Sequence, residues 1–130
     1  MSGDAATWIV AALEVAVALG IAVYWVTWFR QPHDEPWLPV GFVDHETPFV
    51  FTDSILSVVL VVGAILQVAD EPAGDSLGLF AAGMLAFLGV LDLAYFARTG
   101  MFQRGHGGLI NAGVVASVLL MSLILVLRFF

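Results

Sequence analysis

Residues 76–97 read SLGLFAAGMLAFLGVLDLAYFA, an apolar run that contains one charged side chain, Asp92. A helix needs about 20 residues to span the hydrocarbon of a bilayer, so this run predicts a transmembrane helix. Three further apolar runs of similar length lie at 7–29, 49–69 and 109–127. The sequence therefore predicts an all-α, integral membrane four-helix bundle, formed as a single domain over residues 1–130.

The composition supports this fold class. The chain is 61% hydrophobic and its mean hydropathy is +1.00, whereas soluble domains are about 45–50% apolar. The runs lack the alternation of barrel strands. Cysteine and lysine are both absent, which excludes disulfides, thiolate metal sites and a retinal Schiff base. No cofactor is expected.

The charge balance is strongly acidic. Four basic residues, all arginine, stand against eleven carboxylates. Without a basic patch, neither nucleic-acid binding nor adhesion to anionic headgroups is expected. An acidic chain without lysine resembles, in composition, proteins of salt-loving archaea, whose carboxylate-rich surfaces stay hydrated in brine.

The arginines also predict orientation. Arg30, Arg98 and Arg104 lie in the first and third loops, and Arg128 lies alone on the other side. Because basic residues favour the cytoplasmic side, we expect a multi-pass protein of the cell membrane with those loops cytoplasmic and both termini outside. Tryptophans near the predicted boundaries are typical of an aromatic belt: Trp8, Trp25, Trp28 and Trp37.

Small residues recur at helical spacing in three of the runs. Lipid offers no hydrophobic drive for helices to associate, so such residues favour close helix packing, within the bundle or in a homo-oligomer. The ridges are Ala12, Ala16 and Gly20; Gly78, Ala82, Ala86 and Gly89; and Ala112 with Ala116 beside Gly113 and Ser117.

Two aspartates are predicted at similar depth in the membrane. Asp53 lies about four residues into the second helix and Asp92 about five from the end of the third, or roughly 6–8 Å below the interface at 1.5 Å per residue. Intramembrane carboxylates usually face the bundle interior or water. We therefore expect a polar layer that binds a small molecule, cation or proton, and transport would be one use of it. Its other expected members are Tyr24, Tyr95 and Asn111, with Arg30 and Arg98 at the mouth.

Two other interpretations stay open. Asp53 follows Pro48 and Thr52 closely and would cap its helix, while Asp92 would snorkel or pair with Arg98. The protein would then be a structural or accessory subunit that acts through helix packing and oligomerisation. A lipid-modifying enzyme would use one aspartate as general acid or base, but no motif supports it, so an enzyme is the less favoured reading.

Glu14 lies in the outward half of the first helix, away from the aspartates. A lone glutamate in the first of four helices, within "LEV", is similar to the small multidrug resistance transporters, whose glutamate exchanges protons for cationic drugs. This chain departs from them in its 19-residue first loop and in lacking their later helix motifs, so no family is assigned. A proton- or cation-linked Glu14 remains one expectation, and a buried, neutral Glu14 hydrogen-bonded to a neighbouring helix, for example to Ser122, is the other.

The first loop carries HDEP at 33–36 and DHETP at 44–48. Histidine and carboxylate can ligate zinc, which makes His33, Asp44 and His45 weak metal candidates. No HExxH-type spacing appears, so a metal site is not expected. We predict instead an acidic loop that forms a partial lid over the polar layer, with three side chains in the interface: Trp37, Leu38 and Phe42.

Overall fold

The structure is a computed structural model and describes residues 4–130, in which there are helices and no strands. Its elements are α1 (Ala5–Arg30), α2 (Phe42–Glu46), α3 (Phe49–Val68), α4 (Pro72–Thr99), the 3-10 helix η1 (Arg104–His106) and α5 (Gly108–Phe129). Within residues 4–130, four spans are long and apolar enough to cross a membrane, with α2 and α3 forming one of them. The predicted all-α, four-helix fold is confirmed, and the spans indicate a multi-pass membrane protein.

The helix ends follow from their sequences. The Asp4 carboxylate caps α1 by accepting the backbone N–H of Thr7 at 2.9 Å. Pro72 begins α4, where a missing N–H does no harm. Gly100 ends α4 in the left-handed region, at a φ of 74°, which glycine adopts without strain.

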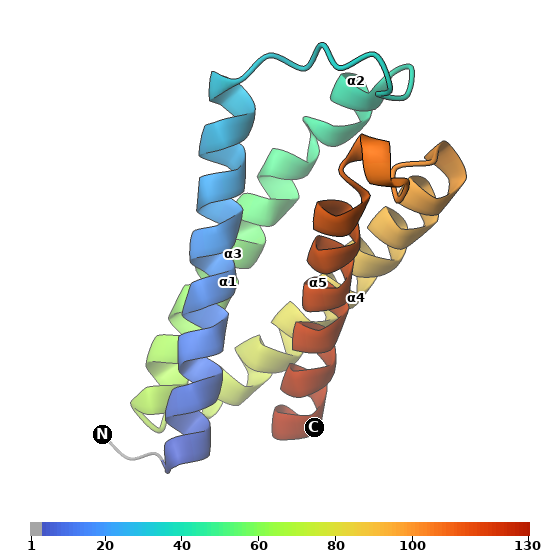
Figure 1. Cartoon of the computed structure of the whole chain (residues 1–130). Coiled ribbons are helices and arrows are strands. Elements are labelled where there is room, and N and C mark those ends of the chain that lie inside the picture. The colour runs from blue at the N-terminus through green and yellow to red at the C-terminus, as the bar shows by residue number, and fades with distance from the viewer. Residues whose placement is uncertain (1–3) are drawn as a thin grey trace.

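The helices are arranged as a chain of neighbours, seen in Figure 1. Helix α1 lies along α3, α3 crosses α4, and α4 lies along α5, whereas α1 and α5 touch at only a few positions. One tie joins them at the end that carries both termini: Arg128 Nη2 donates to Thr7 Oγ1 at 2.8 Å and lies 3.8 Å from Asp4 Oδ1. The bundle is therefore open along its α1/α5 side.

Two buried clusters hold the helices together. The larger one fills the middle of the bundle with aliphatic side chains, among which Leu56, Leu60 and Leu125 are almost completely buried. The second lies under the first and third loops and is rich in rings. We call four of its members the aromatic cluster: Trp25, Trp28, Phe42 and Phe96.

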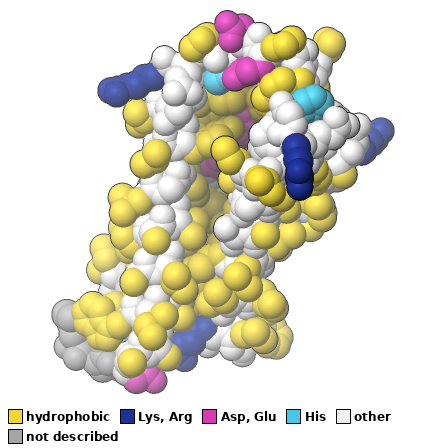
Figure 2. All heavy atoms as spheres, in the orientation of Figure 1, with side chains coloured by type: hydrophobic (Ala, Val, Ile, Leu, Met, Phe, Trp, Pro, Cys, Tyr) yellow, Lys and Arg dark blue, Asp and Glu magenta, His cyan; other side chains and the backbone are white. Residues whose placement is uncertain are grey.

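The distribution of side chains on the surface fits a membrane. Figure 2 shows hydrophobic side chains along the length of the molecule and charged ones mainly at its two ends. The same view shows the face between α1 and α5 hollowed, with acidic side chains inside the hollow near the loop end. We call this hollow the α1/α5 furrow.

The small-residue ridges pack unequally. Gly78, Ala82 and Gly89 of α4 are buried against neighbours, as expected. The α1 ridge is not: Ala12, Ala16 and Gly20 are exposed, and a Cβ on Gly20 would meet nothing within 4 Å. This ridge therefore does not pack inside the bundle, because α1 turns its opposite face to α3, and its packing in a homo-oligomer stays a prediction.

Candidate functional site

Asp53 lies in the second turn of α3 and faces α1. The indole Nε1 of Trp25 donates to Asp53 Oδ2 at 2.8 Å. No side chain caps α3, whose N-cap residue is Pro48. The capping interpretation of Asp53 is therefore wrong, and its carboxylate is used between helices.

Asp92 lies on α4, near the end that carries the third loop. It is half-buried and within electrostatic range of Asp53 and of Glu46. Among residues 4–130 its carboxylate accepts no hydrogen bond, and the one salt bridge there joins Arg128 to Asp4. Pairing of Asp92 with Arg98, one of the two structural interpretations, is therefore not found. The two expected aspartates thus lie within electrostatic range of each other, and Asp92 is the less engaged of the two.

A third carboxylate joins them that sequence reasoning missed. Glu46 ends α2, is 8% exposed, and accepts a hydrogen bond from the hydroxyl of Tyr24 at 3.3 Å. Tyr24 lies within electrostatic range of all three carboxylates. We call Glu46, Asp53 and Asp92 the carboxylate layer. Glu46 and Asp53 lie on two helices, α2 and α3, which Thr47 and Pro48 separate, so helical spacing along one helix gave no signal for Glu46.

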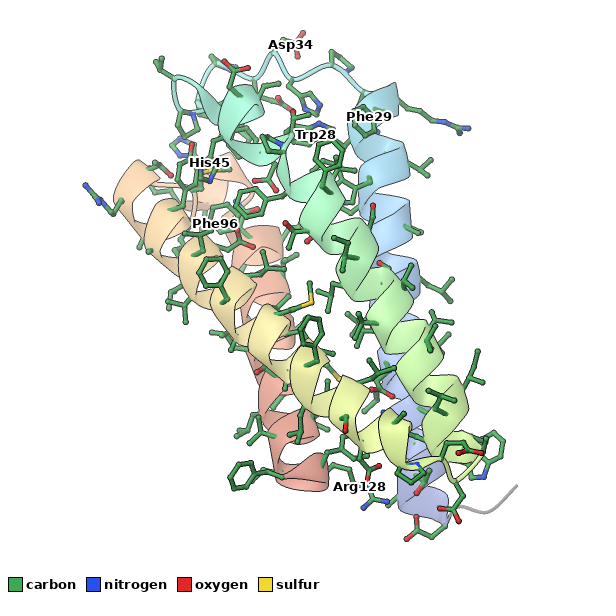
Figure 3. All side chains as sticks on the ribbon, turned by 180° about the vertical axis from the view of Figure 1, so that it is seen from behind. Trp28, Phe29, Asp34, His45, Phe96 and Arg128 are labelled. Atoms are coloured by element: carbon green, nitrogen blue, oxygen red, sulfur yellow. The ribbon has the colours of Figure 1, made fainter. Side chains whose placement is uncertain are left out.

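Tyr95 borders this layer through ring stacking. Its ring lies 3.9 Å from that of His45 with 7° between the planes, and it is within electrostatic range of Glu46. Figure 3 shows His45 and Phe96 on the same end of the molecule as Trp28, opposite Arg128. The loop end of the bundle is thus aromatic around its acids.

The remaining expected members of the layer have other positions. Asn111 donates to the backbone carbonyls of Met101 at 2.7 Å and His106 at 3.3 Å, so it fastens the third loop. Arg30 and Arg98 are exposed in the last turns of α1 and α4, and neither forms a salt bridge within the described part of the chain. The structure therefore brings Tyr24 to the aspartates, places Tyr95 beside Glu46 and commits Asn111 to a structural contact.

The weak metal candidates are separated by their contacts. His33 Nε2 is 2.9 Å from the carbonyl oxygen of Trp28, over whose ring it stacks, while His45 stacks on Tyr95. Asp44 is exposed. From residue 4 onward, no three histidine or carboxylate side chains gather closely enough to hold a metal ion.

The first loop and two of the tryptophans pack inside the protein. Trp25 and Trp28 are buried among protein side chains, at 6% and 8% exposure, so their rings are not on the surface as a belt would require. Phe42 is buried against Trp28, and Trp37 stacks on His106 at 5.2 Å. The loop covers the aromatic cluster, and Asp34 projects outward from it (Figure 3).

Glu14 is fully buried, and its partner differs from the expected one. Gln67 Nε2 of α3 donates to Glu14 Oε1 at 3.0 Å, whereas the hydroxyl of Ser122 donates to the carbonyl of Ala82 at 2.7 Å. Glu14 is therefore buried and hydrogen-bonded to a neighbouring helix as expected, but the example of Ser122 as its partner is wrong. Gln67 was missed, although it is the one amide side chain in the run 49–69.

A separate apolar hollow of about 460 Å³ lies between α3 and α4, lined by Thr52, Leu79, Phe80, Gly83, Met84, Phe87 and Leu88. None of the three carboxylates lines it, so it is distinct from the carboxylate layer.

No family model, curated protein or solved structure matches the chain.

Proposed function

We propose that the carboxylate layer binds a small cation, for which protons compete, and that Asp92 is its principal ligand. The observation that carries this proposal is an Asp92 carboxylate without a hydrogen-bond partner among residues 4–130, within electrostatic range of Asp53 and Glu46. Carboxylates grouped at membrane depth repel one another, so a bound positive charge or a proton stabilises them.

The protein's own cations do not serve this purpose. Arg128, in the one salt bridge formed within residues 4–130, is held by Asp4 at the opposite end of the bundle. Tyr24 and Trp25 each donate a single neutral hydrogen bond to the layer. A hydrogen bond lowers the cost of burying a carboxylate but does not cancel its charge. The layer therefore favours an external cation.

The surroundings of the layer indicate the class of cation. Rings of Tyr24, Trp25 and Tyr95 border it, and the face of an aromatic ring attracts a cation electrostatically. Since the carboxylates do not gather into a metal-sized group, we propose a monovalent or organic ammonium-type cation instead of a caged divalent metal. The α1/α5 furrow (Figure 2) supplies a route of entry.

The predicted orientation of the chain determines the side of the membrane to which the carboxylate layer opens. By the positive-inside rule, Arg30, Arg98 and Arg104 assign the loop end to the cytoplasm and both termini to the outside. Beneath the layer, Leu56 and Leu60 close the middle of the bundle. A site open to one side above a closed apolar layer fits the binding step of a transport cycle, and we propose transport as its use.

The test is calorimetric titration of purified protein with tetramethylammonium and with Na⁺. Wild type is expected to bind one of them, and Asp92→Asn to lose that binding. Asp75→Asn is the matched control, because Asp75 is an exposed aspartate near the other end of the same helix. Binding that survives in Asp92→Asn, or fails in Asp75→Asn alone, would contradict the proposal.

A second candidate function is that of a structural or accessory subunit. The exposed α1 ridge of Ala12, Ala16 and Gly20 favours it, because small residues let another helix approach closely. We propose a second copy of the chain as the partner. Gly20→Leu should then convert a dimer to a monomer in detergent, whereas Gly83→Leu on α4 should not.

A further inference from the structure

A second acidic site lies deeper in the bundle, and it does not depend on the proposed function. Glu14 is 0% exposed and lies eleven residues before Trp25, or roughly 16 Å along α1 at 1.5 Å per residue. Leu56 and Leu60, at 1% and 0% exposure, fill the space between. Glu14 is therefore insulated from the carboxylate layer by apolar packing.

Gln67 holds Glu14 in one defined geometry. Its Nε2 donates both to Glu14 Oε1 at 3.0 Å and to the carbonyl of Gly74 at 3.1 Å. Both amide hydrogens are thereby used. Turning the amide over would set its oxygen against the carbonyl oxygen of Gly74, so the orientation of Gln67 is determined by the turn between α3 and α4.

This geometry leaves two buried oxygens without a donor. Within the described residues, Glu14 Oε2 and Gln67 Oε1 accept no hydrogen bond. Both belong to side chains more than nine-tenths buried, at 0% and 6% exposure. Leaving a buried acceptor unpaired is costly, and an ionised carboxylate in hydrocarbon is costlier still.

We propose that Glu14 is a proton-binding site, in which Oε2 carries a proton and donates it to Gln67 Oε1. One proton then supplies the missing donor to the pair and removes the charge. The neighbours of Glu14 on α3 are neutral: Gln67 donates to it, and a Cβ added at Gly63 would lie 3.8 Å from its Oε1. The α4 groups beside these two, Leu77 and the Gly74 carbonyl, are neutral as well. From α5 the nearest charged residue is Arg128, which is held by Thr7 and Asp4 at the start of α1.

The bound proton links α1 to the α3–α4 turn. Its loss would leave a buried negative charge with one hydrogen bond and no counter-ion among residues 4–130. Ionisation of Glu14 at alkaline pH should therefore loosen the packing of α1 on α3. Close packing of α1 on α3 at this site therefore requires that Glu14 be protonated.

Infrared spectroscopy of the protein in lipid at neutral pH tests this directly. A protonated carboxylic acid has a C=O stretching band that shifts in D₂O. We expect such a band in wild type, its loss in Glu14→Gln, and its retention in Asp92→Asn and in the packing control Ser122→Ala. A band unchanged by Glu14→Gln would overturn the proposal.

Two further measurements keep the proposal testable should Glu14→Gln fail to fold. Gln67→Leu removes the acceptor of the proton, so the band should move to higher frequency; an unmoved band would overturn the proposal. Titration with Na⁺ separates a proton from a metal cation. A carboxylate band that is lost in Glu14→Gln and that responds to Na⁺ would show a cation site instead. These infrared bands report on Glu14 and not on the carboxylate layer. The result of cation titration in Asp92→Asn therefore neither supports nor contradicts the Glu14 proposal.

Discussion

The indole N–H of Trp25 on α1 donates to the carboxylate of Asp53 on α3 at 2.8 Å. This bond crosses between two helices that are not joined by a short turn. It buries the polar edge of Trp25 and gives Asp53 a donor at a depth where water is scarce. On the adjacent residue of α1, the hydroxyl of Tyr24 donates to Glu46 at 3.3 Å, so one turn of α1 donates to two carboxylates.

Removing that donor should destabilise the fold. Trp25→Phe keeps a ring but leaves the partly buried Asp53 carboxylate without its hydrogen bond, at a cost of about 1–3 kcal/mol. Unfolding by denaturant in mixed micelles measures it. In an Asp53→Asn background the same substitution should cost less, because the unpaired charge is already gone. Equal costs in both backgrounds would show that the bond contributes nothing.

Substituting two glycines of α4, Gly74 and Gly83, by alanine should change stability in opposite directions, because only Gly74 lies against the backbone of α3. A Cβ on Gly74 would lie 2.6 Å from the backbone nitrogen of Gln67, so Gly74→Ala should destabilise by about 1–3 kcal/mol, as overpacking does. Gly83 has nothing within 4 Å of its added Cβ. Gly83→Ala should stabilise α4 by about 0.5–1 kcal/mol. Thermal unfolding of the two variants compares them, and equal effects would contradict the packing described.

The cap of α1 should depend on pH. Hydrogen bonds from the backbone N–H and the hydroxyl of Thr7 hold the pKa of Asp4 below its usual range. A lowered pKa in the folded state means that the cap stabilises fully above the unfolded pKa and is lost as pH falls through the folded one. The protection factor of the Thr7 amide, which corrects for the slower intrinsic exchange in acid, should therefore fall as pH drops, and Asp4→Asn should remove most of this pH dependence. An acid response that is the same in Asp4→Asn would refute this role of the cap.

Membrane orientation can be tested by labelling, because the chain has no cysteine. A cysteine at Asp34, in the first loop, should react with an impermeant maleimide only from the cytoplasmic side. A cysteine at Glu71, in the second loop, should react only from outside. The opposite pattern would reverse the assigned sidedness of the carboxylate layer.

The hydropathy of the sequence was sufficient to predict the spans, because a helix in lipid satisfies all its backbone groups within one apolar run. Predicted and observed helices differ mainly at their ends: α4 begins at Pro72 and ends at Thr99, whereas the prediction covered 76–97. The proximity of Asp53 and Asp92 followed from counting residues inward from the loops. Depth depends only on the rise per residue.

The rotation of each helix was not predictable in the same way. The α1 sequence has apolar residues all round, so nothing in its pattern shows that Trp25 and Glu14 face α3 while Ala12 and Gly20 face outward. For the same reason Gln67 could not be matched to Glu14. Glu46 was missed for a different reason, because Pro48 interrupts the backbone between α2 and α3 and the segment before it reads as a loop.

The most direct test of the central claim is proton release on cation binding, measured with a pH dye in weakly buffered protein during addition of the cation identified by titration. If protons and the cation compete for Glu46, Asp53 and Asp92, wild type and Asp75→Asn should release protons as the cation binds, and Asp92→Asn should release none. Cation binding without proton release in wild type, or undiminished release in Asp92→Asn, would contradict the claim that these carboxylates form the site.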